Sequence, residues 1–319
     1  MESIISEAEW RGLLSTRANS PWAIADAYAR RRRPRSLLSP AGNIFLVAAD
    51  HPARGAIGMG GDPMAMADRR SLLERLVVAL SSPYVDGVLG TPDVVEELLL
   101  LGALEGKVVI GSMNRGGLDG AAWTMDDRFT CYTAESVAEF GLEGGKMLLR
   151  IDDGDSGTAR TIESCAHAVS DLASEGLMAM IEPLPYARNQ DGGLVLRKDT
   201  TSLARATSIA SALGSTSAHT WLKLPSCDEP ERVYGATTLP CVVLGGVPSS
   251  DLDSDLASWR RTLTQPSVRG LVVGRALLYP ADGDVAAAVE AAGRVLQSVA
   301  AGSRERVTLS SASGSSGSS

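Results

Sequence analysis

Eight short apolar segments recur along the chain, and a segment with helical periodicity separates each one from the next. Near-continuous apolar runs rich in branched residues are typical of parallel strands buried on both faces, because a half-exposed strand alternates apolar with polar residues. The predicted strands are residues 44–49, 85–89, 107–111, 146–151, 178–182, 219–224, 241–245 and 270–274.

The intervening segments carry signals of helices. Residues 68–80 place their leucines on one side, as an amphipathic helix requires. Thr91 and Pro92 are typical of a helix start, with Thr91 as the N-cap and Pro92 at the first helical position. Further helices are predicted over residues 133–140, 158–174, 201–213, 228–235, 250–263 and 284–299.

Eight strands that are each followed by a helix predict a single (β/α)8 TIM barrel, an α/β fold. The alternative is an open, doubly wound sheet, which favours a Gly-rich turn after its first strand, whereas Asp50 and His51 stand there. We expect residues 1–40 to form an N-terminal helical extension and residues 41–302 to form the barrel. The Ser/Gly-rich residues 303–319 are predicted to be a disordered tail, either native or a tag.

Composition and charge exclude several classes of protein. A formal net charge of −8 argues against nucleic-acid binding, and the one dense basic cluster, residues 30–35, is interpreted as a solvated helix end. The longest apolar run, near residues 98–104, is far below the roughly 18 residues that a membrane helix needs. No secretory signal is evident, and four scattered cysteines without a CxxC pair suit reduced thiols. We expect a cytoplasmic protein with no membrane partner, while self-association into a homo-oligomer stays open.

Only four of the 30 Lys and Arg residues are lysines, and two of them, Lys146 and Lys223, lie within strongly apolar predicted strands. Arginine keeps its proton in proteins, whereas a buried lysine can lose one. A lysine in such a place therefore suggests a chemical role. In a barrel of this kind the active site lies at the C-terminal ends of the strands, so those ends are the candidates.

Lys223 lies near the end of the sixth predicted strand and shares a face with Trp221. If that face points into the barrel, desolvation lowers the pKa of Lys223, and the neutral amine can attack a carbonyl to form a Schiff base. The protonated imine draws electrons, so that a neighbouring carbon–carbon bond can break. A structural ion pair, or an outward-facing lysine, is equally consistent with the spacing.

Other strand ends add candidates of the same kind. Glu182 could act as general acid or base for imine chemistry, or form a structural ion pair. Lys146 could lower the pKa of Lys223 by repulsion, or simply pair with Glu182. Arg150 is a candidate for binding a substrate oxygen or phosphate, and Asp50 is a candidate proton carrier or hydrogen-bond partner of the lysines.

The loops that follow the first, seventh and eighth predicted strands are predicted to bind substrate. His51 and Arg54 begin the loop after the first strand. Loops after the seventh and eighth strands of barrels commonly bind phosphate, because glycines let backbone N–H groups approach the anion. The predicted phosphate cradle consists of Gly245, Gly246, Gly274 and Arg275. No metal site or cofactor is predicted, since the three histidines are spread over the chain.

Together these strand ends resemble the class I aldolase superfamily, which includes tagatose-bisphosphate, archaeal-type fructose-bisphosphate and deoxyribose-phosphate aldolases. The resemblance spans about residues 43–280 and is strongest to the tagatose branch and to uncharacterised actinobacterial (β/α)8 proteins found near inositol catabolism genes. One departure is the first loop, where the tagatose branch has Asp-Gln-Arg-Gly and this chain has Asp-His-Pro-Ala-Arg-Gly. The segments that carry the resemblance are residues 144–150, 181–184, 222–225, 245–246 and 270–275.

The resemblance implies that Lys223 forms the Schiff base, that Glu182 and Lys146 assist, and that the glycine loops with Arg275 bind phosphate. It also matches Asp50 to the aspartate at the end of the family's first strand. The expected function is a metal-independent aldolase acting on a phosphorylated keto-sugar or keto-acid, such as 2-deoxy-5-keto-gluconate 6-phosphate, sulfofructose phosphate or a ketose bisphosphate. Two alternatives are a non-catalytic phosphosugar-binding barrel and a phosphosugar isomerase or epimerase that needs Glu182 and Asp50 but not Lys223.

Overall fold

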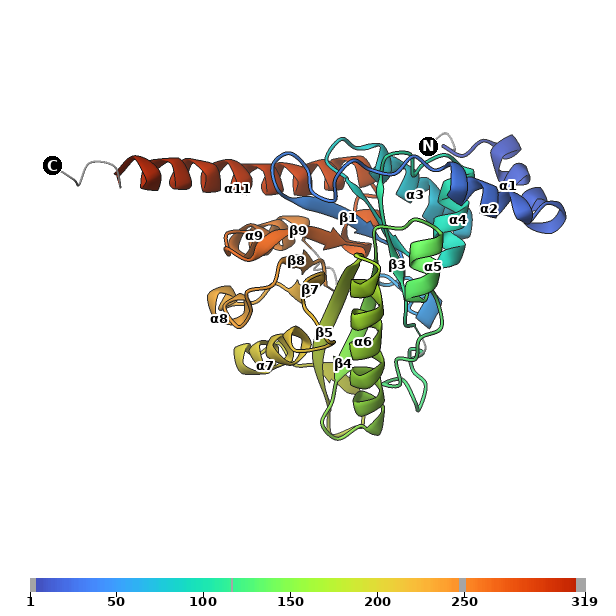
Figure 1. Cartoon of the computed structure of the whole chain (residues 1–319). Coiled ribbons are helices and arrows are strands. Elements are labelled where there is room, and N and C mark those ends of the chain that lie inside the picture. The colour runs from blue at the N-terminus through green and yellow to red at the C-terminus, as the bar shows by residue number, and fades with distance from the viewer. Residues whose placement is uncertain (1–3, 116, 247–250, 314–319) are drawn as a thin grey trace.

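The computed structural model of the chain describes residues 4–115, 117–246 and 251–313. Within these residues eight parallel strands close into a barrel with helices between them (Figure 1), which confirms the predicted (β/α)8 fold. Neighbouring strands pair in chain order, and pairing of the first strand with the last closes the ring. The barrel strands are β1 (Ile44–Ala48), β2 (Gly87–Gly90), β3 (Val108–Ser112), β4 (Gly144–Ile151), β5 (Met178–Arg188), β7 (Thr220–Pro225), β8 (Cys241–Leu244) and β9 (Val268–Val273).

One hairpin was not predicted. Strand β5 continues past Glu182 and turns back into the short strand β6 (Leu194–Leu196), with which it pairs antiparallel. Two prolines, Pro183 and Pro185, argue against such an extension, because proline cannot donate to a sheet. The turn has a local cause, since the Asn189 side chain accepts hydrogen bonds from the backbone N–H groups of Asp191 and Gly193.

Most helices follow the predicted segments to within a few residues; the exceptions are the short helix α10 (Arg275–Leu278), which was not predicted, and α11 (Val285–Ser313), which was predicted to end at residue 299. Pro92 occupies the first helical position as predicted, but the Thr91 hydroxyl donates to Asp93 (2.6 Å) and does not cap the backbone. The helices are α1 (Glu7–Asn19), α2 (Trp22–Arg30), α3 (Arg69–Ser81), α4 (Pro92–Leu100), α5 (Ala134–Glu139), α6 (Ser156–Ser174), α7 (Thr200–Ser211), α8 (Pro230–Tyr234), α9 (Leu252–Leu263), α10 (Arg275–Leu278) and α11 (Val285–Ser313), with a 3-10 turn η1 (Pro52–Arg54).

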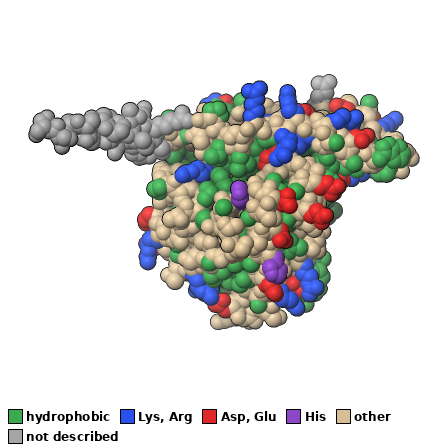
Figure 2. Space-filling view, viewed as in Figure 1, with side chains coloured by type: hydrophobic (Ala, Val, Ile, Leu, Met, Phe, Trp, Pro, Cys, Tyr) green, Lys and Arg blue, Asp and Glu red, His purple; other side chains and the backbone are tan. Residues whose placement is uncertain are grey.

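Helix α11 projects from the barrel (Figure 1) and continues past residue 302, where the sequence predicts that a disordered tail begins. Residues 314–319 of that tail lie outside the described residues. No helix in the described part of the chain is long and apolar enough to cross a membrane. On the face seen in Figure 2, acidic and basic side chains are interspersed over the helices.

The interior of the barrel changes from apolar to charged along the strands. Its lower layers are filled by side chains such as Ile44, Leu46 and Trp221, whereas Phe45 and Val47 point outward against the helices. Trp221 therefore faces inward, and Lys223, two residues further along β7, does the same. The polar side chains at the C-terminal ends of the strands therefore lie at the open end of the barrel, which we call its mouth. Apolar layers fill the barrel beneath them.

The basic cluster at residues 30–35 is only partly a solvated helix end. Arg31 is 6% exposed, and its guanidinium donates to the carbonyl oxygens of Lys107 (2.8 Å) and Gly141 (2.6 Å) and to the Glu143 carboxylate (3.0 Å). Arg33 reaches the same carboxylate (3.0 Å). The end of α2 is thereby fixed to the segments that enter β3 and β4.

We expect Arg31→Met to lower the free energy of unfolding by about 2–4 kcal/mol, because it leaves two carbonyls and part of a buried carboxylate without a donor. Urea unfolding measures the effect. The matched control is Arg32→Met, whose side chain is mostly exposed and should change stability by about 0.5 kcal/mol or less. Equal losses in the two variants would contradict the assignment.

Candidate active site

A cavity of about 110 Å³ opens at the C-terminal ends of the strands. Nine of the eleven predicted site residues line it, from Lys223 and Glu182 to the glycine loops. The other two, Asp50 and Lys146, are fully buried directly beneath it. A larger cavity of about 600 Å³ lies by the N-terminal ends of β1 and β9, but among the described residues Arg269 is the one charged residue in its lining. The chemistry-bearing groups therefore gather at the mouth.

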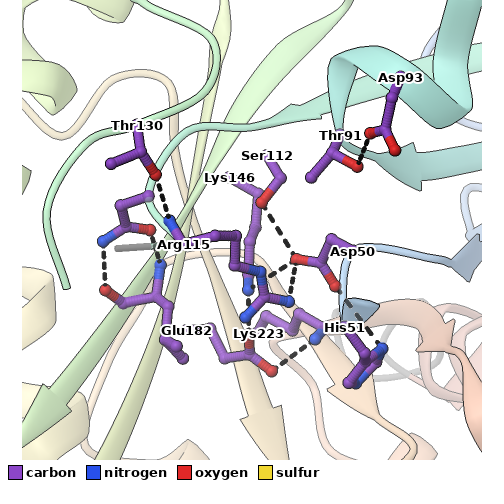
Figure 3. A network of polar contacts seen from close by, with 12 residues as sticks. Asp50, His51, Thr91, Asp93, Ser112, Arg115, Thr130, Lys146, Glu182 and Lys223 are labelled. Carbon is purple, nitrogen blue, oxygen red and sulfur yellow. Dashed lines mark hydrogen bonds and ion pairs between the residues drawn. The ribbon is translucent and has the colours of Figure 1, made fainter. Parts of the chain in front are cut away.

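Lys223 and Lys146 contact the two oxygens of one carboxylate (Figure 3). Lys223 is 4% exposed, and its Nζ donates to Glu182 Oε1 at 2.5 Å. The Lys146 Nζ forms an ion pair with Glu182 Oε2 and lies 3.3 Å from Asp50 Oδ2. Both lysines point inward, so the outward-facing alternative is excluded, and the pairing of Lys146 with Glu182 is present.

Arg115 is the residue of this network that the sequence analysis missed. It follows β3, is 5% exposed, lines the cavity, and forms an ion pair with Asp50 Oδ2. The Ser112 hydroxyl donates to the same oxygen at 3.1 Å. Its position in the sequence marked it as a candidate, because Arg115 follows a predicted strand by a few residues, as Arg54 follows the first strand. It was not predicted because no candidate was named after the third predicted strand, residues 107–111.

Three cations surround the two buried carboxylates and keep them ionised. Burial alone would raise the pKa of Asp50, but Arg115 and Lys146 lower it well below its ordinary value. Burial opposes ionisation of Glu182 in the same way, and the adjoining Lys146 and Lys223 lower its pKa. Burial and the charge of Arg115 lower the pKa of Lys146, against the attraction of the two carboxylates. Lys146 thus has a lowered pKa while its carboxylate partners stay charged.

His51 supplies a neutral polar group beside Asp50. Its Nδ1 lies 3.8 Å from Asp50 Oδ1, and neither atom has a hydrogen-bond partner among the described residues. Burial lowers the pKa of His51 to about 3, so the imidazole is uncharged at neutral pH. A hydroxyl placed between these two atoms could donate to the carboxylate and accept from the imidazole.

Arg150 holds a mouth loop in place. Its Nε donates to Asp127 Oδ2 (2.8 Å), and its Nη2 donates to Asp127 Oδ1 (2.6 Å) and to the carbonyl oxygens of Thr124 and Gly117. These partners belong to the long loop between β3 and α5. Arg150 also lines the cavity, so substrate contact stays a prediction, but most of its donors are already engaged.

The residues of the predicted phosphate cradle lie directly after β8 and β9. Gly274 is required by packing, since an added Cβ would stand 2.5 Å from the Ala48 carbonyl oxygen. Gly246 has a φ of +69°, which favours glycine. Arg275 makes no ion pair with the described residues, and its Nε lacks a hydrogen-bond partner there.

Among the described residues, no group of three or more His, Cys, Asp or Glu is placed to hold a metal ion.

Comparisons with known proteins agree with this geometry. A family model described as Cgl0159-like matches residues 42–293. The crystal structure of Cgl0159 from Corynebacterium glutamicum is 48% identical and superimposes with a TM-score of 0.90, covering 93% of this chain and 99% of that one. An archaeal fructose-1,6-bisphosphate aldolase, solved with its catalytic Lys bound to the carbinolamine intermediate of its substrate, has the same fold at 16% identity. Its TM-score is 0.62, over 86% of this chain and 99% of that one.

A curated 4-hydroxy-tetrahydrodipicolinate synthase of Stenotrophomonas maltophilia is 35% identical over 127 residues. The match covers 39% of this chain and 39% of the length of that relative. The predicted resemblance to actinobacterial barrel proteins is thus confirmed, and the archaeal-type aldolase shares the barrel fold.

We expect Asp50→Asn to lower the free energy of unfolding by about 3–5 kcal/mol at pH 7, because Arg115 and Lys146 then stay buried without their counter-charge. The folded-state pKa of Asp50 lies below its ordinary value of 3.8, so its carboxylate stabilises the fold above that value and loses this contribution as the pH falls below it. The difference between wild type and variant should therefore stay constant from pH 6 to about pH 5 and shrink as the pH falls below about 4.

Urea unfolding at a series of pH values measures this difference. Asp153→Asn is the control, since that carboxylate is exposed and pairs only with the exposed Arg205. A gap between wild type and Asp50→Asn that is constant from pH 6 to pH 3 would refute the assignment.

Proposed function

Because the chain belongs to the Cgl0159-like family and carries a buried lysine in the mouth of its barrel, we propose that it is a class I aldolase. It forms or cleaves a carbon–carbon bond in a phosphorylated keto-sugar or keto-acid through a Schiff base on Lys223. The observation that carries this proposal is the Lys223 amine, which lines the cavity and lies 2.5 Å from Glu182. An amine so placed can reach a carbonyl that enters the mouth, next to a group that can exchange protons with it.

The first step is the attack of the neutral Lys223 amine on the ketone carbon. The proton that Lys223 must lose has an acceptor in reach, the Glu182 carboxylate. Two protons must reach the carbonyl oxygen before it leaves as water: the one that Glu182 took from Lys223, and a second one that the nitrogen loses once it is bonded to the carbon. Loss of water from this carbinolamine leaves the iminium ion. Since the neighbouring lysines lower the pKa of Glu182, it is a weak base that passes the proton on readily.

The second step breaks the carbon–carbon bond. The hydroxyl on the carbon β to the iminium loses its proton, that carbon becomes the aldehyde, and the bonding electrons move into the iminium to give an enamine. Protonation of the enamine and hydrolysis of the resulting imine release the ketone and restore Lys223. These steps move protons at the lysine nitrogen, at the substrate oxygens and at the enamine carbon, and Glu182 is the carboxylate in contact with the Lys223 amine at which they occur.

The cradle at β8 and β9 fits the phosphate of such a substrate. Arg275 has no ion pair with the described residues, and the three glycines of the cradle line the cavity, where the lack of a side chain lets backbone N–H groups approach an anion. Candidate substrates are 2-deoxy-5-keto-gluconate 6-phosphate, sulfofructose phosphate and ketose bisphosphates. The expected location is the cytoplasm.

The proposal is tested by borohydride trapping. The protein is incubated with each candidate phosphosugar and sodium borohydride, which reduces an imine to a stable secondary amine. We expect the intact mass to rise by the ketone-bearing fragment and peptide mapping to locate the adduct on Lys223.

Lys223→Met should abolish the adduct, whereas Lys198→Met, which removes an exposed lysine, should leave it unchanged. Turnover without any adduct would favour an isomerase or epimerase. Binding of phosphosugars without turnover, unchanged in Lys223→Met, would favour a non-catalytic barrel.

Glu182→Gln keeps the shape of the side chain but removes the proton acceptor. We expect kcat to fall by about 10²- to 10⁴-fold, the usual contribution of a general acid–base group. The adduct on Lys223 should still form, more slowly, in the trapping assay. A variant with full activity would exclude Glu182 from proton transfer.

A further inference from the structure

Strand β3 leaves the regular sheet directly after Ser112. Up to that residue it runs parallel to β4, with Ser112 opposite Lys146, and the Met113 N–H still donates to the Lys146 carbonyl oxygen at 2.9 Å. Asn114 instead forms an isolated antiparallel bridge with Phe129, in the segment that returns from the loop between β3 and α5. The main chain of Asn114 therefore pairs with the loop at the position where a regular strand would pair with β4.

The side chain of Asn114 takes over the pairing with β4. It is fully buried, its Oδ1 accepts a hydrogen bond from the Leu148 N–H, and its Nδ2 donates to the Leu148 carbonyl oxygen, both at 2.6 Å. An asparagine amide offers an acceptor and two donors, so it can bind both main-chain groups of one residue. The Nδ2 also donates to the Asp127 carbonyl oxygen of the loop (3.3 Å). The amide thereby fixes the part of β4 that lies between Lys146 and Arg150.

The returning segment holds the other side of this strand end. The N–H groups of Thr130 and Cys131 both donate to the Met113 carbonyl oxygen at 3.1 Å. The Arg115 N–H donates to the Thr130 hydroxyl at 3.4 Å (Figure 3). The chain from Met113 to Arg115 is thus fixed by the loop on one side and by the Asn114 amide on the other.

The break at Asn114 changes which side chain points into the barrel. In a continued strand, Ser112 and Asn114 would face the interior, and the residues on either side of Asn114 would face the helices. Ser112 does face inward, since its hydroxyl donates to Asp50, and Met113 packs in the outer layer. Arg115 departs from the alternation, because it lines the cavity and forms an ion pair with Asp50 (Figure 3). The inward position of Arg115 therefore follows from the break.

The position of Arg115 determines how the Asp50 carboxylate is shared. Its Oδ2 contacts Arg115, Lys146 and Ser112, whereas its Oδ1 lies 3.8 Å from His51 Nδ1 without a hydrogen-bond partner among the described residues. Burial lowers the pKa of Lys146 most, and the charge of Arg115 lowers it further. An Arg115 that pointed away would leave the Asp50 charge to Lys146, which would then hold its proton more tightly.

We propose that Asn114 is a positioning residue, which turns the end of β3 out of the sheet and thereby directs Arg115 onto Asp50. Asn114 is not among the described residues that line the cavity, and its amide is occupied by Leu148 and Asp127, so it acts through Arg115. That this arrangement serves catalysis rests on the proposed aldolase function, whereas the arrangement itself does not.

The first test is structural and needs no substrate. Asn114→Leu keeps the approximate size of the side chain and removes its hydrogen bonds to Leu148 and Asp127. We expect the crystal structure of this variant to show the Arg115 guanidinium displaced from Asp50. If the variant does not fold, Asn114→Ser, which is smaller and keeps a polar group, takes its place. An Arg115 that stays on Asp50 in the variant would overturn the proposal.

The second test is a double-mutant cycle on kcat, with the phosphosugar that is trapped on Lys223. We expect Asn114→Leu to lower kcat about 10- to 100-fold, as displacement of a site group does. In the Arg115→Met background the same substitution should change kcat by about threefold or less, because the group through which Asn114 acts is already absent. A merely structural role would lower kcat by the same factor in both backgrounds, and that result would refute the proposal.

Thr207→Val is the matched control. It also removes a buried hydrogen bond, from the Thr207 hydroxyl to the Leu203 carbonyl oxygen (2.9 Å), but on helix α7. We expect this variant to lose stability and to keep the kcat of wild type. An equal loss of kcat in Thr207→Val and Asn114→Leu would show a general effect of destabilisation and contradict the proposal.

The two tests separate this proposal from the aldolase function. If no phosphosugar is trapped on Lys223, the aldolase function fails, and the crystal structure still decides whether Asn114 positions Arg115. If an adduct forms and Arg115 stays in place in the variant, the aldolase function stands and the role of Asn114 is refuted. A displaced Arg115 with unchanged kcat would refute the catalytic part of the proposal.

Discussion

The structure depends on a buried run of alternating charges, from Lys223 through Glu182, Lys146 and Asp50 to Arg115. None of these groups could be buried alone, because removing an isolated charge from water costs several kcal/mol or more. Together they satisfy one another only when the strands that carry them close into a ring. The buried ion pairs that form the site therefore exist only while the barrel is closed.

The arginines and the lysines at the mouth of the barrel have different properties. Arginines hold shape and attract anions, as Arg150 does for the loop between β3 and α5 and as Arg275 is placed to do at the glycine cradle. In the proposed mechanism, the lysines occupy the positions at which a proton is gained or lost. Because arginine keeps its proton and lysine can lose it, the scarcity of lysine in the chain points to the few positions that use this property.

Much of the fold and part of the site could be predicted from local patterns. The eight strands, most helix starts and the inward face shared by Trp221 and Lys223 follow from periodicity over a few residues. The β5–β6 hairpin escaped prediction because its strand contains two prolines, although its turn residues carried a signal. Arg31 was misinterpreted because its partners, Lys107, Gly141 and Glu143, lie far from it in the chain.

The sequence by itself determined which residue types reach the mouth, since strand alternation and the position of a strand end are local properties. Only the tertiary structure decided their partners and depth: Lys146 and Asp50 are 96 positions apart, and Lys223 and Glu182 are 41 apart. Closure of the ring and the register between strands determine which side chains share a layer, and no local pattern encodes them. For the same reason Asp50 and Lys146 lie beneath the cavity, and Arg115 forms part of its wall.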